Sequence, residues 1–238
     1  MKYNLKKELI RMNKDDSSFL STTYNDSLKR VLRFEIYSFI GRFFSIFSKF
    51  EDLSKKYLNI GSGYNLLPNF INIDFYNNSF FKYYLSFKFL PKPIPELQHD
   101  LRYPLPFSKN RFDGIFSEHT LEHLYPNEAL NLLIEMHRCL KDGGIIRLSL
   151  PNTEKMIIKY FNNEPSSDCR TRGEYLNGIY KWGHRAHYDA EFVIYLLETL
   201  GFNNVKEVSF GEGQDHNLLV EQFSRKEDSF IVEGTKFL

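Results

Sequence analysis

Two short apolar runs on either side of a glycine loop constrain the fold of this chain more than any other feature. The first run, residues 57–60, breaks into a Gly-Ser-Gly loop at residues 61–63, and the second run, residues 70–73, ends on Asp74. Glycine adopts backbone angles that other residues avoid, and without a Cβ it lets a ligand lie against the main chain. In an open parallel sheet, an acidic residue at the end of the next strand can bind ribose hydroxyls. The pattern therefore indicates a nucleoside-containing cofactor.

The charge and composition of the chain limit its size class and its partners. The 238 residues are 42% hydrophobic and 26% charged, which suits one sizeable globular domain with an appendage. With 31 Lys and Arg against 30 Asp and Glu, no overall field attracts nucleic acid. The two cysteines, Cys139 and Cys169, have no metal-like spacing, which predicts a reduced, cytoplasmic setting. We expect no cleaved leader, and no apolar run has the length of a membrane span.

The chain divides into an N-terminal arm and amphipathic helix at residues 1–55 and a domain at residues 56–238. One helix, or two broken near Gly41, is predicted for residues 27–50. Its apolar positions at helical spacing are Leu32, Ile36, Phe39, Ile40, Phe43, Phe47 and Phe50. This face predicts a lid on the domain or a homodimer contact. A peripheral membrane contact is the alternative, because the apolar face is aromatic and its flanks are basic, and the sequence leaves the choice open.

Strands and helices alternate through the rest of the chain. Strands are predicted at residues 112–117, 144–150, 205–210 and 229–237. One helix begins at Pro126 and ends at Gly143 or Gly144, and a second is capped by Asp189 and ends at Gly201. Their predicted inward positions are Leu130, Leu133, Ile134, His137 and Leu140 in the first helix and Phe192, Leu196, Leu197 and Leu200 in the second. The alternation predicts an α/β fold with a doubly wound, mostly parallel sheet.

Five stretches in order resemble the motifs of class I S-adenosylmethionine-dependent methyltransferases of the type 11 branch. They are Leu58–Gly63, Asn72–Asp74, Asp100–Leu101, Phe112–Leu124 and Leu140–Gly144. The resemblance covers residues 55–238 and implies a Rossmann-like sheet, S-adenosylmethionine as the cofactor and methyl transfer as the activity. In one departure from the family, Tyr64 and Asn65 stand where a third small residue is usual.

The resemblance also implies which residues bind the cofactor. Gly61 and Gly63 would face its methionine portion, Asp74 would accept the two ribose hydroxyls, and Asp100 with Leu101 would contact the adenine. The whole set implied to bind the cofactor is Asn59, Gly61, Gly63, Asp74, Asp100, Leu101 and Ser117. Asp74 fits a hydroxyl contact independently, because it ends a predicted strand after the glycine loop. Asp100 could equally be an ordinary turn residue.

The densest polar stretch is residues 117–123. On a helical turn, His119, Glu122 and His123 would share one face at spacings i, i+3 and i+4. Metal-dependent O-methyltransferases of quinone biosynthesis and of small-RNA 3′ ends resemble this stretch, so these three residues are candidate ligands of a divalent ion. Many metal-free members of the branch carry a similar Leu-Glu-His, and we therefore expect no metal. His119 is the predicted general base, because imidazole titrates near neutrality, and Glu118 is its substitute.

A second polar stretch, residues 182–189, precedes the last predicted helix. In a doubly wound sheet this loop lies over the carboxyl edge, where ligands bind. His187, Tyr188 and Arg185 are predicted to bind the acceptor, and His184 is a further catalytic candidate. The histidines could instead only tie down the loop, while Asp189 caps the helix.

The sequence thus predicts a methyltransferase that acts on a hydroxyl of a small molecule or a glycan, of the bacterial surface polysaccharide or lipid-linked sugar type. Nucleic acid is excluded as a partner, because neither a basic patch nor the signature of amino-group methylation is present near residues 151–152. Two alternatives stay open. One is a binding module that keeps the fold without catalysis, and the other is a partner protein recruited to a membrane through residues 27–50.

Overall fold

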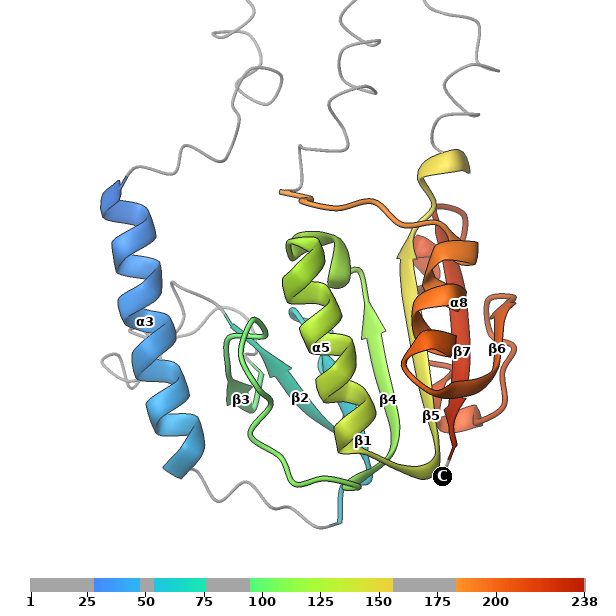
Figure 1. Cartoon of the computed structure of the whole chain (residues 1–238), viewed down its shortest axis with the longest axis horizontal. Coiled ribbons are helices and arrows are strands. Elements are labelled where there is room, and N and C mark those ends of the chain that lie inside the picture. The colour runs from blue at the N-terminus through green and yellow to red at the C-terminus, as the bar shows by residue number, and fades with distance from the viewer. Residues whose placement is uncertain (1–27, 48–53, 76–94, 156–182, 238) are drawn as a thin grey trace, which may run out of the picture.

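The computed structural model describes residues 28–47, 54–75, 95–155 and 183–237 (Figure 1). The predicted arm at residues 1–25 and most of the region between Asp74 and the third strand lie outside the described residues, as does Cys169. Among the described residues, no helix combines the length and the apolar character that a membrane crossing needs.

Seven strands form one sheet, and most of them run parallel. They are β1 (Tyr57–Ile60), β2 (Phe70–Asp74), β3 (Leu97–Gln98), β4 (Phe112–Glu118), β5 (Leu140–Pro151), β6 (Phe202–Val208) and β7 (Ser229–Lys236). Their order is β3-β2-β1-β4-β5-β7-β6, and only β7 runs antiparallel to its neighbours β5 and β6. This is the predicted doubly wound α/β architecture, and its topological switch point lies between β1 and β4, where such sheets bind ligands.

Helices cover the sheet unequally. Helices α5 (Pro126–Cys139) and α8 (Ala190–Thr199) lie in front of the sheet in the view of Figure 1, while α3 (Leu28–Phe47) lies beyond the β3 edge. The main core gathers one face of each strand, such as Ile115 and Ile146, against these helices. On the other face, Phe70, Phe116 and Leu218 form a smaller core under η2 (His216–Leu218). We call residues 209–222, which cover that face, the strap.

The ends of two helices follow the predicted signals. Pro126 occupies the first turn of α5, where the side chain of Glu128 accepts a hydrogen bond from the backbone N of Tyr125. The carboxylate of Asp189 accepts from the backbone N of Phe192 at 2.7 Å and so caps α8 as predicted.

The predicted inward face of α5 was right at Leu133 and wrong at Leu130 and Ile134, which are 39% and 45% exposed. The other buried positions of the helix are Ala129, Leu132, Met136 and Cys139. The helix also ends before Gly143, because Leu140 already belongs to β5. In α8 the buried residues are Val193 and Leu197, whereas Phe192 is 46% exposed.

Helix α3 runs unbroken through Gly41 and packs on the domain by its polar side. Ser38 donates to a carboxylate oxygen of Asp100 at 2.5 Å, and Glu35 pairs with Arg102 at 2.9 Å. The predicted apolar stripe faces outward, since Ile36 and Phe39 are 48% and 63% exposed. At these described positions the stripe does not cover the domain, and the side chains of Phe47 and Phe50 lie outside the described residues.

Candidate functional site

The loop after β1 is shaped by its two glycines and by the loop after β4. Gly61 and Gly63 have φ angles of +67° and +55°, in the left-handed region that favours glycine. A Cβ on Gly61 would lie 2.0 Å from the hydroxyl oxygen of Thr120, so no other residue fits there. The ends of β1 and β4 thus meet at the switch point, where Thr120 packs against Gly61 and the loop is half-buried.

Asp74 closes the other side of this loop. Its Oδ2 accepts from the backbone N of Gly63 at 2.9 Å, and its Oδ1 accepts from the backbone N of Phe75 at 2.6 Å. Each carboxylate oxygen has a second lone pair, so the side chain can still accept hydroxyl groups. Burial raises the pKa of Asp74 above its usual range, against the effect of these two hydrogen bonds.

Two buried hydroxyls beside the loop have no hydrogen-bond partner among the described residues. They are Oγ of Ser62, inside the glycine loop, and Oγ of Ser117, whose residue pairs with Ile60 across β1 and β4. Buried polar atoms rarely remain unsatisfied in the absence of a ligand or water. The glycine loop, Asp74 and the two orphaned hydroxyls fit the polar, hydroxyl-bearing cofactor that the sequence predicts.

Asn59 and Asp100 are held by the protein itself. The side-chain amide of Asn59 donates to Asn72 Oδ1 and to the carbonyl of Asn65, both at 2.9 Å, so it holds the loop in place. The carboxylate of Asp100 accepts from the Arg102 guanidinium and from Ser38. The side chain of Leu101 is buried in the main core. The predicted adenine contact would therefore have to come from the backbone of Leu101.

Four side chains from two loops converge beyond the end of β4. The carboxylate of Glu122 is 2% exposed, and its Oε1 lies 3.6 Å from Nδ1 of His119 and 4.0 Å from Nε2 of both His123 and His184. Residues 121–123 form only a short 3-10 turn, η1, and His119 lies outside it. The predicted single helical face was therefore wrong, although its three residues do meet, and His184 joins them.

Burial controls the protonation of this cluster. It lowers the pKa of His119 to about 3 and that of His184 to about 4, and it raises the pKa of Glu122 to about 8. His119 has a φ of +50°, which is uncommon for a residue other than glycine and recurs at functional sites. Its Nε2 is 2.7 Å from the hydroxyl of Ser229 at the start of β7.

Glu118, the predicted substitute base, is engaged by the strap. Its two oxygens face the backbone N of Gln222 at 3.1 Å and the side-chain amide of Gln222 at 2.9 Å. Burial raises the pKa of Glu118 above its usual value, against these two hydrogen bonds. Both oxygens hold donors, so Glu118 attaches the strap to the end of β4.

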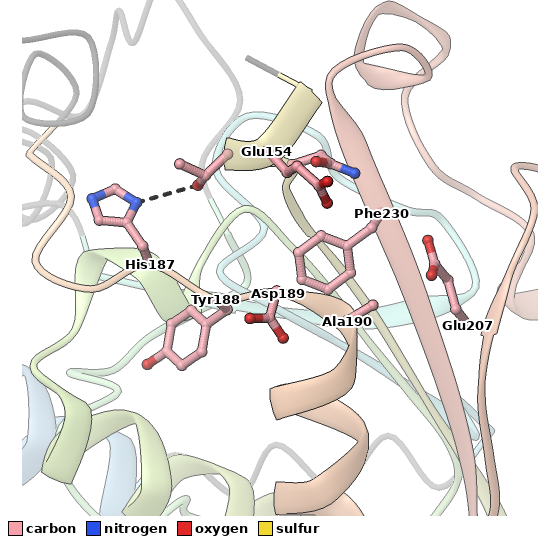
Figure 2. A pocket seen from close by; sticks show the side chains of 9 residues that line it. Glu154, His187, Tyr188, Asp189, Ala190, Glu207 and Phe230 are labelled. Atoms are coloured by element: carbon pink, nitrogen blue, oxygen red, sulfur yellow. Dashed lines mark hydrogen bonds between the residues drawn. The ribbon is translucent and has the colours of Figure 1, made fainter. Parts of the chain in front are cut away.

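A cavity of about 540 Å³ opens at the end of β5 (Figure 2). Its lining comprises Asn152, Thr153, Glu154, His187, Tyr188, Asp189, Ala190, Glu207 and Phe230. This volume lies in the usual range of small-molecule sites. Two of the three predicted acceptor residues, His187 and Tyr188, thus line it. The third, Arg185, places its guanidinium 4.4 Å from the ring centre of Tyr125.

The residues that sequence reasoning missed are those supplied by strand ends. Ser229 and Phe230 open β7, and Asn152 follows directly on β5. The one available signal was position. The carboxyl ends of the parallel strands, which Asn152 and Thr120 follow, lie at the ligand-binding edge, and the antiparallel β7 begins at that same edge.

Comparisons with known proteins match the part of the chain that carries the glycine loop, Asp74 and the end of β4. Residues 60–148 match the family model of the methyltransferase domain, type 11. No curated protein matches the sequence.

Several solved structures share the fold. A chain in the complex between the Haloferax volcanii Trm112 methyltransferase activator and a methyltransferase is 11% identical with a TM-score of 0.50, over 94% of this chain and 99% of that chain. A SAM-dependent methyltransferase from Archaeoglobus fulgidus is 17% identical with a TM-score of 0.48, over 96% and 99%. Phosphoethanolamine N-methyltransferase 2 from Haemonchus contortus, in complex with S-adenosyl-L-methionine, is 12% identical with a TM-score of 0.45, over 90% and 58%.

Proposed function

Because residues 60–148 form a type 11, S-adenosylmethionine-dependent methyltransferase domain, we propose that this chain methylates a hydroxyl oxygen of a small molecule or a glycan. The observation that carries the proposal is the switch-point site. There the glycine loop, Asp74 and two buried serine hydroxyls that lack a partner among the described residues lie at the ends of β1, β2 and β4. The cofactor, when bound, supplies a methyl group on a sulfonium, which is already a good leaving centre. The protein's own task is then to hold two reactants in line and to remove one proton.

The cofactor would be held from both sides of the glycine loop. The backbone of Gly61 and Gly63 is bare enough for close approach, and the free lone pairs of Asp74 can accept two hydroxyls. Ser62 and Ser117 each offer a buried hydroxyl that lacks a partner among the described residues. Asn59 and Asp100 would contribute indirectly, because their side chains hold the glycine loop and the β3 edge in position.

His119 is the proposed acceptor of the hydroxyl proton. Burial lowers its pKa to about 3, so the near-neutral titration expected from the sequence was wrong, and the ring is uncharged and able to accept a proton at pH 7. It follows β4 directly, and its ring reaches Ser229, whose neighbour Phe230 lines the cavity. His119 therefore lies between the glycine loop on one side and the cavity on the other. Its left-handed backbone is a strain that a surface loop would not need, which supports a catalytic role.

The cavity supports a hydroxyl-bearing acceptor. Carboxylates from Glu154, Asp189 and Glu207 and polar groups from Asn152 and Thr153 surround it, and Phe230 supplies an apolar face. Figure 2 shows the Tyr188 ring directed away from Glu154 and Phe230. Carboxylate and amide oxygens accept hydrogen bonds from neighbouring hydroxyls, while a ring face covers the apolar side of a sugar.

Calorimetric titration with S-adenosylmethionine and its demethylated product tests the cofactor site. We expect Asp74→Ala to weaken binding by about 1 to 3 kcal/mol, through loss of charge-assisted hydrogen bonds. Asp189→Ala, which removes a carboxylate outside the glycine loop, is the matched control and should leave this affinity unchanged. If the wild-type chain binds neither compound, the proposed methyltransferase activity is contradicted and a binding module without catalysis is favoured.

Transfer of a labelled methyl group to a panel of acceptors tests the chemistry. Sugars with free hydroxyls should be methylated, and His119→Ala should lower the rate by roughly 100-fold or more, as for loss of a general base. Methylation of amines but not of hydroxyls would refute the acceptor class.

We also propose that the outward face of α3 rests on an anionic lipid surface. The exposed residues Leu32, Ile36, Phe39 and Phe43 form an apolar stripe, and the exposed Arg33 lies beside it. Glu35, the single acidic residue in the helix sequence, is engaged by Arg102, so among the described side chains of α3 the exposed charge is that of Arg33. Such a stripe with basic neighbours is typical of helices that lie in a membrane interface.

Flotation of the full chain with vesicles distinguishes this contact from a dimer. Vesicles that contain phosphatidylserine should carry the wild type upward, neutral vesicles should carry less, and the double variant Ile36→Ser, Phe39→Ser should stay below. If the wild type binds neither kind of vesicle and light scattering gives twice the mass of one chain, the stripe is a dimer contact and not a lipid contact.

A further inference from the structure

The feature that the methyl-transfer proposal leaves unexplained is the carboxylate of Glu122. Its side chain is 2% exposed, and neither oxygen has a hydrogen-bond partner among the described residues. Leaving a buried carboxylate unpaired is costly, and such groups in proteins are normally paired with a donor or bound to a metal. The surroundings of Glu122 therefore need a further occupant or a further role.

The fold brings imidazoles to Glu122 by main-chain hydrogen bonds. The carbonyl of Glu122 accepts from the backbone N of Arg185 at 2.6 Å and from that of Ala186 at 3.2 Å. These bonds fasten the loop before α8 to η1 and place His184 beside His123. The centres of the two imidazole rings are 4.9 Å apart, in an edge-to-face arrangement. The convergence of the two loops is thus built by the backbone and does not depend on the histidines.

The distances within the cluster are too long for hydrogen bonds. Oε1 of Glu122 lies 4.0 Å from Nε2 of His123 and 4.0 Å from Nε2 of His184, whereas a hydrogen bond to nitrogen needs about 3.2 Å or less. One ligand atom from each of the three side chains lies within 4.8 Å of the other two. Three atoms at about 2.0 to 2.2 Å from one metal ion are at most about 4.4 Å apart. A small inward movement of the rings would therefore enclose an ion.

We propose that Glu122, His123 and His184 form a binding site for a divalent transition-metal ion. Two imidazoles with one carboxylate suit Zn²⁺, Mn²⁺ or Fe²⁺, whereas Mg²⁺ prefers oxygen ligands. The site does not rest on the methyl-transfer reaction, because it is defined by these three side chains alone. It also differs from the set expected from sequence spacing, since His184 replaces His119 as a ligand.

The neighbours of the cluster leave room for an ion. Nε2 of His123 faces Glu122, while the backbone of Gly183 lies near the His123 ring and opposes the lowering of its pKa by burial. The side chain of His123 is 42% exposed against 10% for His184, so an ion can enter past His123. The charge of Arg225 reaches Glu122, but within the described part of the chain no hydrogen bond or ion pair joins them.

Titration with Co²⁺ and Zn²⁺ tests the proposal without any activity assay. Full-length protein that has been treated with a chelator should bind one ion per chain, and Co²⁺ should give visible absorption bands of nitrogen and oxygen ligation. Glu122→Gln and His184→Ala should each weaken metal binding by about 100-fold or more. Loss of a residue that only orients a ligand already weakens metal binding by about 10- to 100-fold, and loss of a ligand should weaken it at least as much. His216→Ala, which removes a histidine from η2, is the matched control and should bind as the wild type does.

Two results would overturn the site. One is a wild type that binds neither ion at micromolar concentration, and the other is binding that persists in both Glu122→Gln and His184→Ala. Because His184 lies on a loop, its variant keeps the test valid even where Glu122→Gln unfolds, which circular dichroism would reveal. Binding of S-adenosylmethionine is measured separately, so failure of the metal site leaves the methyltransferase proposal intact, and the reverse also holds.

Discussion

Two of the buried carboxylate clusters in the described part of the chain differ in their hydrogen bonding. Under the strap, Arg147 is fully buried with Glu221 and Glu233, and its guanidinium donates to both carboxylates and to the carbonyl of Glu212. At the end of β4, Glu122 is as deeply buried but accepts no hydrogen bond among the described residues. We call these the paired cluster and the open cluster.

The difference separates a structural from a functional use of buried charge. The paired cluster fastens the strap to the middle of β5 and β7, and Gln214 adds a backbone N that donates to Glu233 at 3.0 Å. Arg147 bonds both carboxylates, although Oε2 of Glu221 has no hydrogen-bond partner among the described residues. A buried ion pair of this kind positions chain segments, whereas removing one partner leaves an uncompensated charge. The open cluster fastens nothing through its side chains, so its carboxylate stays available to a ligand.

The largest expected effect is on the paired cluster. Arg147→Met should lower the free energy of unfolding by about 3 to 5 kcal/mol, because two buried carboxylates lose their counter-ion. Urea denaturation followed by circular dichroism measures this loss. Lys141→Met, which removes an ion pair with Asp113 from a side chain that is 45% exposed, is the control and should cost at most about 1 kcal/mol. Equal losses in the two variants would show that the paired cluster is not structural.

Sequence patterns predicted the elements of the fold better than their faces. Apolar runs and turn residues identified the strands, and Pro126 and Asp189 marked helix starts, because these signals are local. The outward stripe of α3 and the exposed Leu130 were not predictable, since both sides of these helices carry apolar residues and periodicity alone does not choose between them.

The site was predictable where it is local and hidden where it depends on tertiary contacts. The glycine loop and Asp74 come from one strand–loop–strand unit, whose geometry follows from its own residues. The arrival of His184 at Glu122 is set by backbone bonds between distant loops, which no spacing rule encodes. Arg147 gave no signal either, because a charged residue within a strand is ordinarily assigned to the solvent face.

A smaller effect is expected at the helix that follows the open cluster. Asp189→Ala removes the cap that accepts from the backbone N of Phe192, which should cost about 1 kcal/mol of stability. Thermal unfolding measures it. Asp189→Asn keeps a capping oxygen and should recover most of the loss. A loss shared equally by both variants would mean that the charge of Asp189, and not its cap, stabilises α8.

The open cluster should tolerate the loss of its carboxyl group. We expect Glu122→Gln, in protein treated with a chelator, not to lower the free energy of unfolding by more than about 0.5 kcal/mol, because no hydrogen bond or ion pair is broken and burial already disfavours the charged carboxylate. Glu233→Gln is the matched variant in the paired cluster and should be clearly destabilising, since Glu233 accepts from Arg147 and Gln214. Urea denaturation of the two variants side by side compares them. If Glu122→Gln clearly lowers the free energy of unfolding, then Glu122 stabilises the fold in the same way as the paired cluster.

The smallest effect concerns the hydrogen bond that ties the strap to β1. Tyr57 donates from its hydroxyl to Asp215 Oδ2 at 2.7 Å, and burial, together with this bond, raises the pKa of Tyr57 to about 12 from the ordinary value of 10.0. Between these two pH values the unfolded chain releases the proton while the folded chain keeps it, so this part of the stability is present below pH 10 and is lost as the pH rises toward 12.

Tyr57→Phe should therefore be less stable than the wild type at pH 8, and the difference should shrink as the pH approaches 12. Urea denaturation at a series of pH values measures the shrinkage, and Tyr195→Phe, at a tyrosine that is 62% exposed, should show none. A difference that stays constant with pH would mean that the strap is held by the paired cluster alone.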